Sequence, residues 1–248
     1  MKANKVVIGA LSTFLSSGAI AGTMGAIAPN SWSRVMTLSA GAEWTNSGDT
    51  QTLFLIPEVE KTYSADKNTS VLFSGEFFYG WQRALNPTFS GQIGLAVAAT
   101  SNAMITGEIW DDADPEFNNY LYAYKINHTH VAVKGKLLAD MGYMVTPYLN
   151  GSVGVGFNHA YSYSNTPIIF EAIPNPNFAS HTQTAFSYTA GAGIQHALSQ
   201  NWLVGVGYEF ADWGRSTLGI APGQTQGTGL TQAHVYTNGV LVSISYLA

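Results

Sequence analysis

Residues 184–213 alternate between apolar and small or polar side chains with a period of two. One face of the first half carries Phe186, Tyr188 and Ile194 among alanines, whereas the other face carries only Ser, Thr, Gly and Gln. After a break at residues 199–201 the alternation resumes. A period of two places successive side chains on opposite faces of a β-strand, so this stretch predicts a β-hairpin.

The polarity of the two faces favours a membrane β-barrel over a soluble sandwich. A soluble sandwich has a bulky apolar core and charged residues outside. Here the second face is small and polar with the single carboxylate Glu209, and the apolar face is edged by aromatics such as Trp202 and Phe210. A barrel in lipid has an apolar exterior and a narrow, polar interior, which matches this distribution.

The first 21 residues have the features of a secretory signal. Lys2 and Lys5 precede an uncharged run at residues 6–15, and Ala19 and Ala21 form a small-residue cleavage site. The apolar run is shorter than the ~20 residues that a spanning helix needs. We therefore expect a cleaved signal peptide at 1–21, a short lead-in at 22–31 and a barrel domain at 32–248. The chain has no cysteine, and hence no lipoprotein attachment site.

The composition excludes several other classes of protein. Without Lys2 and Lys5 the 10 basic residues become 8 against 15 acidic ones, a net charge of −7, which argues against nucleic acid as a partner. Charged residues make up 10% of the chain, well below the roughly 25% of soluble domains. No mature segment is apolar for long enough to predict a membrane helix. A barrel is then the way to cross a membrane.

Eight segments show the alternation, and their apolar positions are expected to face outward. In the third, Ile93, Ile105 and Ile109 share one parity and are all predicted outside, with Glu108 inside. In the fourth the alternation slips near Asn127, which predicts a bulge. The segments are residues 32–45, 71–82, 90–110, 120–138, 147–163, 185–195, 202–210 and 234–248.

The connections between these segments alternate strictly in length. Short connections lie at residues 85–89, 139–143 and 199–201, and long ones at residues 46–70, 111–119, 164–183 and 215–231. Outer-membrane barrels have short periplasmic turns and longer extracellular loops. We therefore predict an all-β, eight-stranded antiparallel up-and-down transmembrane barrel in a bacterial outer membrane, with both termini periplasmic. The long first loop leaves room for ten strands.

The chain resembles the small eight-stranded outer-membrane β-barrel family that includes the opacity proteins, OmpX and the membrane domain of OmpA. The resemblance covers residues 32–248. Its most local feature is the last strand, where a polar residue precedes Gly239 by two positions and Val242, Ile244 and Tyr246 follow in alternation. In the family such a strand is the signal read by the outer-membrane assembly machinery. The family ends on Phe or Trp, whereas this chain ends Tyr-Leu-Ala.

Ionisable residues gather on the parity expected to face the lumen. An eight-stranded barrel has an interior that side chains fill, and buried charges there need partners. We predict a structural network of ion pairs and hydrogen bonds; the alternative is a narrow, cation-preferring conduit. The predicted members are Glu43, Glu76, Glu108, Glu209, His128, His130, Lys134 and Lys136.

Aromatic residues concentrate near the strand ends, as expected of girdles at the two membrane–water boundaries. The predicted girdle is Trp44, Tyr79, Trp81, Trp110, Tyr120, Tyr161, Trp202 and Trp213.

No motif points to a cofactor, a metal or catalysis. His128 and His130 could begin a metal site, but no third ligand is identifiable. The acidic residues 111–116 lack the glycine of a calcium loop. No histidine is followed by Ser at the spacing of the lipid A deacylases, so a lipid-modifying enzyme is the weakest of the possibilities.

Two functions remain. The first is a non-enzymatic surface protein whose loops, especially residues 46–70 and 164–183, contact a host or matrix ligand or neighbouring lipopolysaccharide. The second is a small porin with a narrow lumen. In either case the expected surroundings are outer-membrane lipid and lipopolysaccharide.

Overall fold

The computed structural model describes residues 32–46, 48–170 and 172–248. The predicted signal peptide, residues 1–21, and the lead-in, residues 22–31, lie outside the described residues. Within the described part, no helix is long and apolar enough to cross a membrane. The elements are β1 (Ser33–Thr45), β2 (Gln51–Ile56), β3 (Val59–Ala65), β4 (Ser70–Ala84), β5 (Phe89–Thr100), β6 (Ala103–Asp111), the 3-10 helix η1 (Pro115–Phe117), β7 (Asn118–Ala139), β8 (Thr146–Pro167), β9 (His181–Ala197), β10 (Trp202–Asp212), β11 (Ser216–Thr217), β12 (Thr231–Gln232) and β13 (Tyr236–Leu247).

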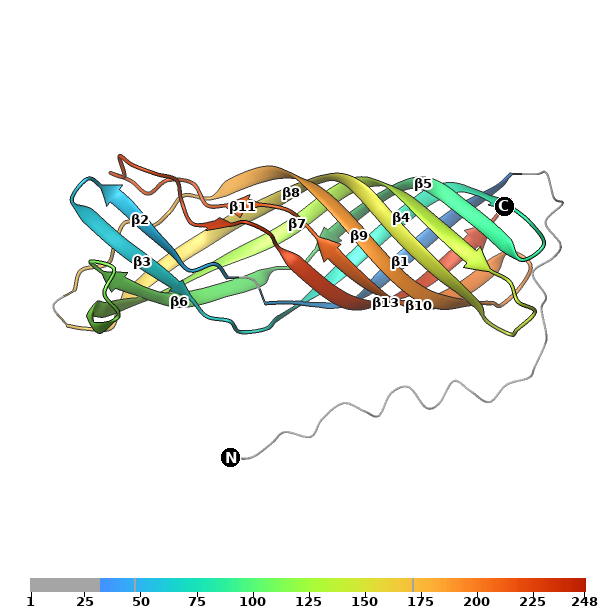
Figure 1. The fold of residues 1–248 in the computed structure, drawn as a ribbon, viewed down its shortest axis with the longest axis horizontal. Coiled ribbons are helices and arrows are strands. Elements are labelled where there is room, and N and C mark those ends of the chain that lie inside the picture. Colours follow the sequence, from blue (N-terminus) through green and yellow to red (C-terminus); the bar gives the residue numbers. More distant parts are fainter. Residues whose placement is uncertain (1–31, 47, 171) are drawn as a thin grey trace, which may run out of the picture.

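Eight antiparallel strands close into a ring (Figure 1). Around the ring the order is β1, β4, β5, β7, β8, β9, β10 and β13, and β13 returns to β1. The last closure pairs Ser39 with Ser243 and Leu38 with Ile244. The predicted eight-stranded antiparallel barrel is therefore confirmed.

The long first loop holds two further strands, but they do not widen the ring. β2 pairs with β3, and β3 pairs with β6, which continues β5 beyond the ring. In Figure 1 these strands lie at the left-hand end of the barrel, together with the adjoining ends of β7 and β8. The ten-strand alternative is thus wrong because β2 and β3 lengthen the barrel wall on one side.

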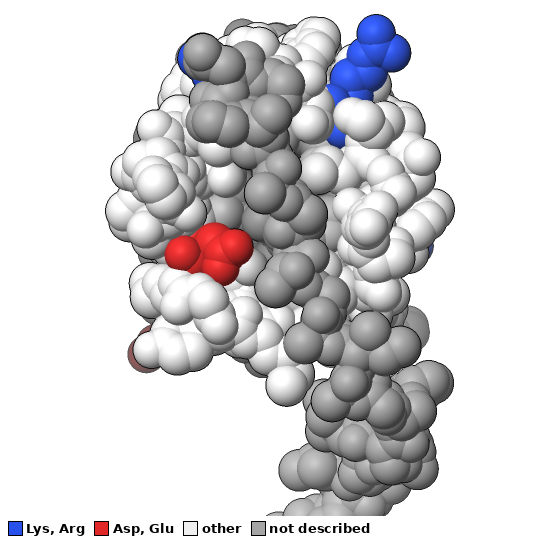
Figure 2. Space-filling view, turned by 90° about the vertical axis from the view of Figure 1, so that its right-hand side faces the viewer, with Lys and Arg blue, Asp and Glu red and all other residues white. Residues whose placement is uncertain are grey.

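The two ends of the barrel differ in kind. One end, here the turn end, holds the short connections and the first and last described residues, joined where Arg34 N donates to the Ala248 carbonyl (3.0 Å). Most of its described surface is uncharged (Figure 2). The opposite end, here the loop end, holds β2, β3, η1, β11 and β12. Long and short connections therefore segregate as predicted.

The outer wall of the ring is apolar. Large side chains on every ring strand are exposed there, whereas the residues between them face the lumen. Such a continuous apolar belt far exceeds what a water-soluble surface carries, and it suits contact with lipid. The exposed set includes Leu38, Phe73, Phe77, Leu95, Val97, Val131, Val133, Val153, Phe186, Val206 and Val242.

Beyond the ring, the extension built from β2, β3, β6 and the adjoining halves of β7 and β8 has the opposite polarity. Its outer face carries Thr106, Glu108 and Lys125 together with the exposed Met104 and Leu121, whereas its inner face is apolar and buried. This inner face belongs to one cluster, here the dome cluster, formed by Tyr63, Ile105, Ile109, Tyr120, Tyr122, Tyr124, Ile126, Ala160, Tyr163, Phe178, Leu218, Ala221 and Leu230. The extension is therefore built like a water-soluble domain.

The segment predicted as one strand over residues 90–110 is two strands. β5 and β6 are separated at residues 101–102, and the register against β7 slips by one residue between the pairs Ala99–Thr129 and Ala103–Ile126. The slip moves odd-numbered residues from the outer face to the inner one. Ile105 and Ile109 are consequently buried inside, so their predicted outward orientation is wrong.

The bulge predicted near Asn127 is also wrong. Even-numbered residues of β7 face inward along the whole strand, from Tyr120 to Leu138. The parity of the strand does not change near Asn127. What changes there is which face carries the apolar side chains. An irregularity does occur on the neighbouring β8, where Ser162 has φ 54° and the register with β7 shifts.

Candidate functional site

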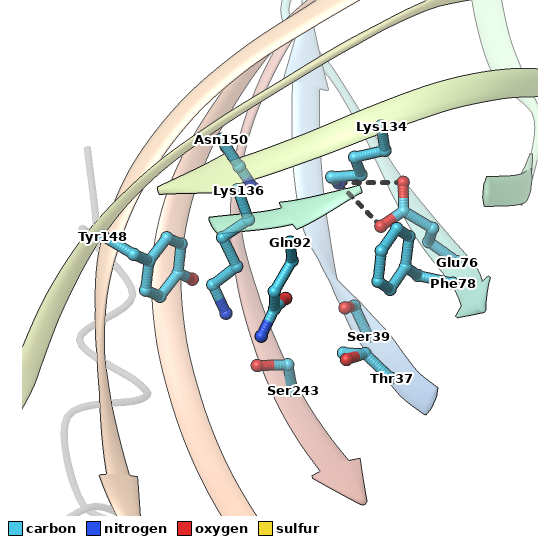
Figure 3. Close-up of a pocket in the computed structure, with 10 residues that line it drawn as sticks. All are labelled: Thr37, Ser39, Glu76, Phe78, Gln92, Lys134, Lys136, Tyr148, Asn150 and Ser243. Carbon is cyan, nitrogen blue, oxygen red and sulfur yellow. Dashed lines mark hydrogen bonds and ion pairs between the residues drawn. The ribbon is translucent and has the colours of Figure 1, made fainter. Parts of the chain in front are cut away.

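A buried lysine bridges the walls of the lumen. Lys134 on β7 donates to both oxygens of Glu76 on β4 (2.6 and 2.9 Å; Figure 3). It also donates to Glu209 Oε2 on β10 (3.0 Å). Asn150 Nδ2 also donates to Glu209 (3.4 Å). All three charged side chains are buried. We call this group the lysine bridge; it ties together strands that are not neighbours in the ring.

The second lumen lysine is held without a carboxylate. Lys136 Nζ donates to Gln195 Oε1 (2.7 Å) and lies 3.8 Å from the centre of the Tyr148 ring. The Tyr148 hydroxyl in turn occupies space left by two glycines, since a Cβ at Gly193 or Gly207 would lie 2.5 Å from it. The small residues on the lumen parity thus make room for large neighbours.

Nearer the loop end, two histidines and a tryptophan form a layer across the lumen. His128 Nδ1 is 2.6 Å from Asn158 Oδ1, and its Nε2 is 3.3 Å from His130 Nδ1. The Trp213 ring lies over both imidazoles, with centroids 4.1 and 4.9 Å away. Asn158 Nδ2 donates to the Trp213 carbonyl (2.8 Å), and Trp213 Nε1 donates to Thr237 Oγ1 (3.0 Å). The base of the last loop is therefore fixed inside the lumen.

Trp213 was predicted in the outer girdle, and this is wrong: its side chain is 3% exposed. β10 ends at Asp212, whose carboxylate accepts from Gly214 N (2.8 Å). Gly214 has φ 72°, a conformation that glycine adopts without strain. This turn directs the chain into the barrel mouth and takes Trp213 with it.

Most of the predicted network shares the lumen, but Glu108 does not. Glu108 lies on the outer face of β6, where it accepts from Trp110 Nε1 (3.3 Å). Glu43 is buried against β13, and a Cβ at Gly239 would lie 2.4 Å from its Cγ. The lumen residues are Glu43, Glu76, Glu209, His128, His130, Lys134 and Lys136.

The lumen around the lysine bridge holds little free space. Cavities of about 40 and 20 Å³ border the lysine bridge, each with room for only one or a few waters. Towards the turn end, Val35, Phe78 and Ala96 form an apolar layer with Leu247 packed against it. The network, the histidine layer and this apolar layer together leave little space for a continuous water path.

The loop end is closed by the dome cluster. The Phe178 ring packs edge-on against Tyr63 (5.5 Å) and Tyr163 (5.0 Å). Burial raises the pKa of Tyr63, Tyr122 and Tyr163 well above the ordinary value, so these hydroxyls stay neutral. Leu218 of the last loop completes the cluster. Side chains from three of the four long connections, residues 46–70, 164–183 and 215–231, therefore meet in one core.

Polar contacts fasten the loops to each other as well. Gln51 on β2 exchanges two hydrogen bonds with the backbone of Thr231 on β12, both 3.0 Å long. Gln232 Nε2 donates to the Tyr124 hydroxyl (2.9 Å). The sequence did not predict the dome cluster because its apolar residues are spread over separate segments with no common period.

The remaining girdle residues divide into three groups. Tyr79 packs against Trp81 near the turn end (5.8 Å), and Trp202 packs against Tyr246 (5.0 Å). On the outer wall nearer the loop end, Trp44 packs against Tyr208 (6.1 Å), and Tyr161 stacks on His159 (4.8 Å). Trp110 lies on β6, beyond the ring. Tyr120 is 6% exposed within the dome cluster, so its predicted girdle position is wrong.

The C-terminal strand has the orientation that the sequence predicts. Val242 and Ile244 are exposed on the outer wall, and Tyr246 contacts Trp202 there. Gly239 faces the lumen beside Glu43. Recognition of this strand by the assembly machinery stays a prediction.

The closed ring of eight antiparallel strands with an apolar outer wall defines the fold of a small outer-membrane β-barrel. No family model and no curated protein sequence matches the chain. Solved structures that it resembles are those of outer-membrane barrels. Neisserial surface protein A has 12% identity and a TM-score of 0.44 over 86% of this chain and 96% of that one.

Two further structures show the range of these barrels. The attachment invasion locus protein Ail of Yersinia pestis has 16% identity and a TM-score of 0.34, covering 88% of this chain and 98% of that one. The outer membrane protease OmpT from Escherichia coli has 8% identity and a TM-score of 0.45, covering 91% and 100%. At these identities the likeness concerns the fold alone.

Proposed function

We propose that this outer-membrane protein is a non-enzymatic surface protein, in which the barrel is structural and the loop end binds a ligand on a host cell or in a matrix. The observation that carries the proposal is the dome cluster, which packs three of the four long connections into one body. A preorganised surface loses less conformational entropy on binding than mobile loops do.

The loop tips supply a binding surface of suitable chemistry. Phe117, Ile168 and Ile173 are exposed there, and Phe170 is 99% exposed. Ile168 N donates to the Asn119 carbonyl (2.9 Å), which joins this segment to the strand after η1. We call these four residues the tip patch. Exposed apolar groups with carboxylates nearby in the chain, such as Glu116, are typical of a protein interaction site.

The filled lumen supports this role over that of a narrow conduit. An ion crossing the barrel would have to displace the lysine bridge, the layer of His128, His130 and Trp213, and the apolar layer at Phe78. Removing charges from such pairs costs several kcal/mol per ion.

Adhesion of bacteria that display the full protein tests the proposal. We expect Ile168→Ser, Phe170→Ser and Ile173→Ser together to abolish binding to host cells or matrix proteins. The matched control is Met141→Ser, Tyr143→Ser and Met144→Ser, three equally exposed residues of a turn-end connection. Equal binding by both variants, or steady single-channel conductance of the folded protein in a planar bilayer, would contradict the proposal.

A further inference from the structure

A polar groove of about 370 Å³ lies on the wall of the barrel near the loop end. It runs between the base of the first long loop and the start of β13, where His234 Nδ1 lies 2.9 Å from Asp212 Oδ2. Its volume lies within the range of small-molecule sites, about 300–1,000 Å³. The side chains that line this rim groove are Asn46, Asp49, Lys67, His234, Tyr236 and Asn238.

One side of the rim groove presents hydrogen-bonding groups with unused capacity. Asn46 Oδ1 accepts from Thr69 (2.7 Å) and Asn238 Oδ1 accepts from the Tyr208 hydroxyl (2.8 Å), so each amide group keeps its Nδ2 as a donor. Asp49 uses one carboxylate oxygen to accept from Ala233 N (2.9 Å) and keeps the other.

The other side of the rim groove is a stack of aromatic rings in which Tyr236 lies between Phe210 and His234. The His234 and Tyr236 rings are nearly parallel, with 3° between planes and 5.3 Å between centroids, and Phe210 extends the stack at 5.8 Å from Tyr236. A sugar ring offers a C–H face to an aromatic ring and a rim of hydroxyls to amides and carboxylates. The rim groove combines both kinds of group, and Lys67, whose Nζ donates to the Gly48 carbonyl, adds a cation with further N–H donors.

The position of the rim groove indicates which kind of saccharide it would bind. Tyr236 and Asn238 lie on the outer face of β13, and the same face continues as Val240, Val242 and Ile244, all exposed. A headgroup held in the rim groove would therefore have its acyl chains beside this apolar wall. Trp44 and Tyr208 lie next to this face, because the Tyr208 hydroxyl donates to Asn238 and Trp44 packs against Tyr208. Both are of the residue types that mark membrane–water boundaries.

We propose that the rim groove binds the saccharide headgroup of a glycolipid in the outer leaflet, of the lipopolysaccharide class. The His234 ring, backed by Tyr236 at the end of the stack, packs on a sugar ring, Asn46, Asn238 and Asp49 hydrogen-bond its hydroxyls, and Lys67 pairs with a phosphate or carboxylate on the sugar. The proposal rests on the outer-membrane location of the barrel and is independent of adhesion through the tip patch.

The test is calorimetric titration of the full-length barrel in detergent micelles. The probes are lipopolysaccharide, its delipidated core oligosaccharide and phosphatidylethanolamine. We expect lipopolysaccharide to bind more tightly than either of the others. Tyr236→Ala and Asn238→Leu should each weaken that binding about tenfold, the size expected for losing one aromatic or hydrogen-bonding anchor.

The matched control is Tyr79→Ala, which removes an equally accessible outer-wall tyrosine at the turn end and should leave the affinity unchanged. Folding of each variant is checked by heat-shifted gel mobility. Equal affinity of all variants, or no binding of either saccharide probe, would overturn the proposal. If the oligosaccharide binds as tightly as lipopolysaccharide, the ligand is a soluble saccharide and the lipid part is wrong. Adhesion of bacteria that display Tyr236→Ala should be unchanged, so a failure of this proposal can be told apart from a failure of the proposal for the tip patch.

Discussion

The ring and the extension above it are built from the same strands with opposite polarity. On β7 the inward residues are His130 and Lys134 within the ring, but Tyr122 and Tyr124 within the extension. The strand keeps one parity throughout. The apolar face changes sides between the two regions, and we infer from this that lipid surrounds the ring and water surrounds the extension. Polarity along a strand therefore reports the medium outside it as well as the direction of its side chains.

The two regions should also respond differently to substitution. The ring interior depends on paired charges and hydrogen bonds, so loss of one partner leaves others buried and unpaired. The dome cluster depends on apolar contact, so loss of a side chain leaves a cavity.

The largest effect is expected at the lysine bridge. Lys134→Ala removes the cation between Glu76 and Glu209 and should destabilise the barrel by about 3–5 kcal/mol. Unfolding in urea, followed by gel mobility, measures this. Lys125→Ala, on the outer face of the same strand, is the control. An unchanged midpoint for Lys134→Ala would show that the ring does not depend on this network.

A smaller and local loss of stability is expected in the dome cluster. Phe178→Ala empties the space between Tyr63 and Tyr163, and should cost about 3 kcal/mol within the extension. Hydrogen exchange should increase in β2, β3 and β6 but not in β1 or β13. Phe117→Ala, at an exposed site, should change neither. Faster exchange throughout the ring would mean that the two regions unfold as one unit.

A third substitution tests how the regions are joined. Asn158 is buried and links His128 to the backbone of the last loop. Asn158→Ala should therefore release residues 213–218 at a cost of about 1–2 kcal/mol. Their amide exchange measures the release. In the double variant with Phe178→Ala, coupling between the two sites would appear as a change in exchange that differs from the sum of the two single changes. Strict additivity would indicate that the Asn158 contacts and the dome cluster are independent.

The smallest effect is expected at Glu108. Because it lies on the outer face of the extension, Glu108→Gln should change stability by less than about 0.5 kcal/mol. Glu76→Gln, which alters the lysine bridge, is the comparison in the same urea experiment. A large loss of stability in Glu108→Gln would indicate that Glu108 belongs to the lumen network.

The sequence predicted the ring well because lipid and lumen impose a simple period on each strand. It failed where two changes overlap. Between β5 and β6 the register slips by one residue at the same place where polarity reverses, so Ile93 and Ile109 keep one parity although they face opposite sides. On β7 the reversal occurs without a slip, and the sequence resembles a bulge at Asn127.

The same reversal explains the misplaced aromatics. Tyr120 lies on the extension, where an inward aromatic belongs to an apolar core, and Trp213 enters the lumen through the turn at Gly214. Neither position carries a local signal, because each depends on contacts between loops distant in the sequence. The dome cluster was missed for that reason.

Cysteine labelling along β7 tests the reversal of polarity most directly. The chain has no cysteine, so Leu121→Cys, Lys125→Cys, Val131→Cys and Val133→Cys each introduce a single thiol on the outer face. With the full protein in the outer membrane, a water-soluble maleimide should label positions 121 and 125 and leave 131 and 133 unlabelled. Labelling of all four positions, or of none, would contradict a membrane boundary near Asn127.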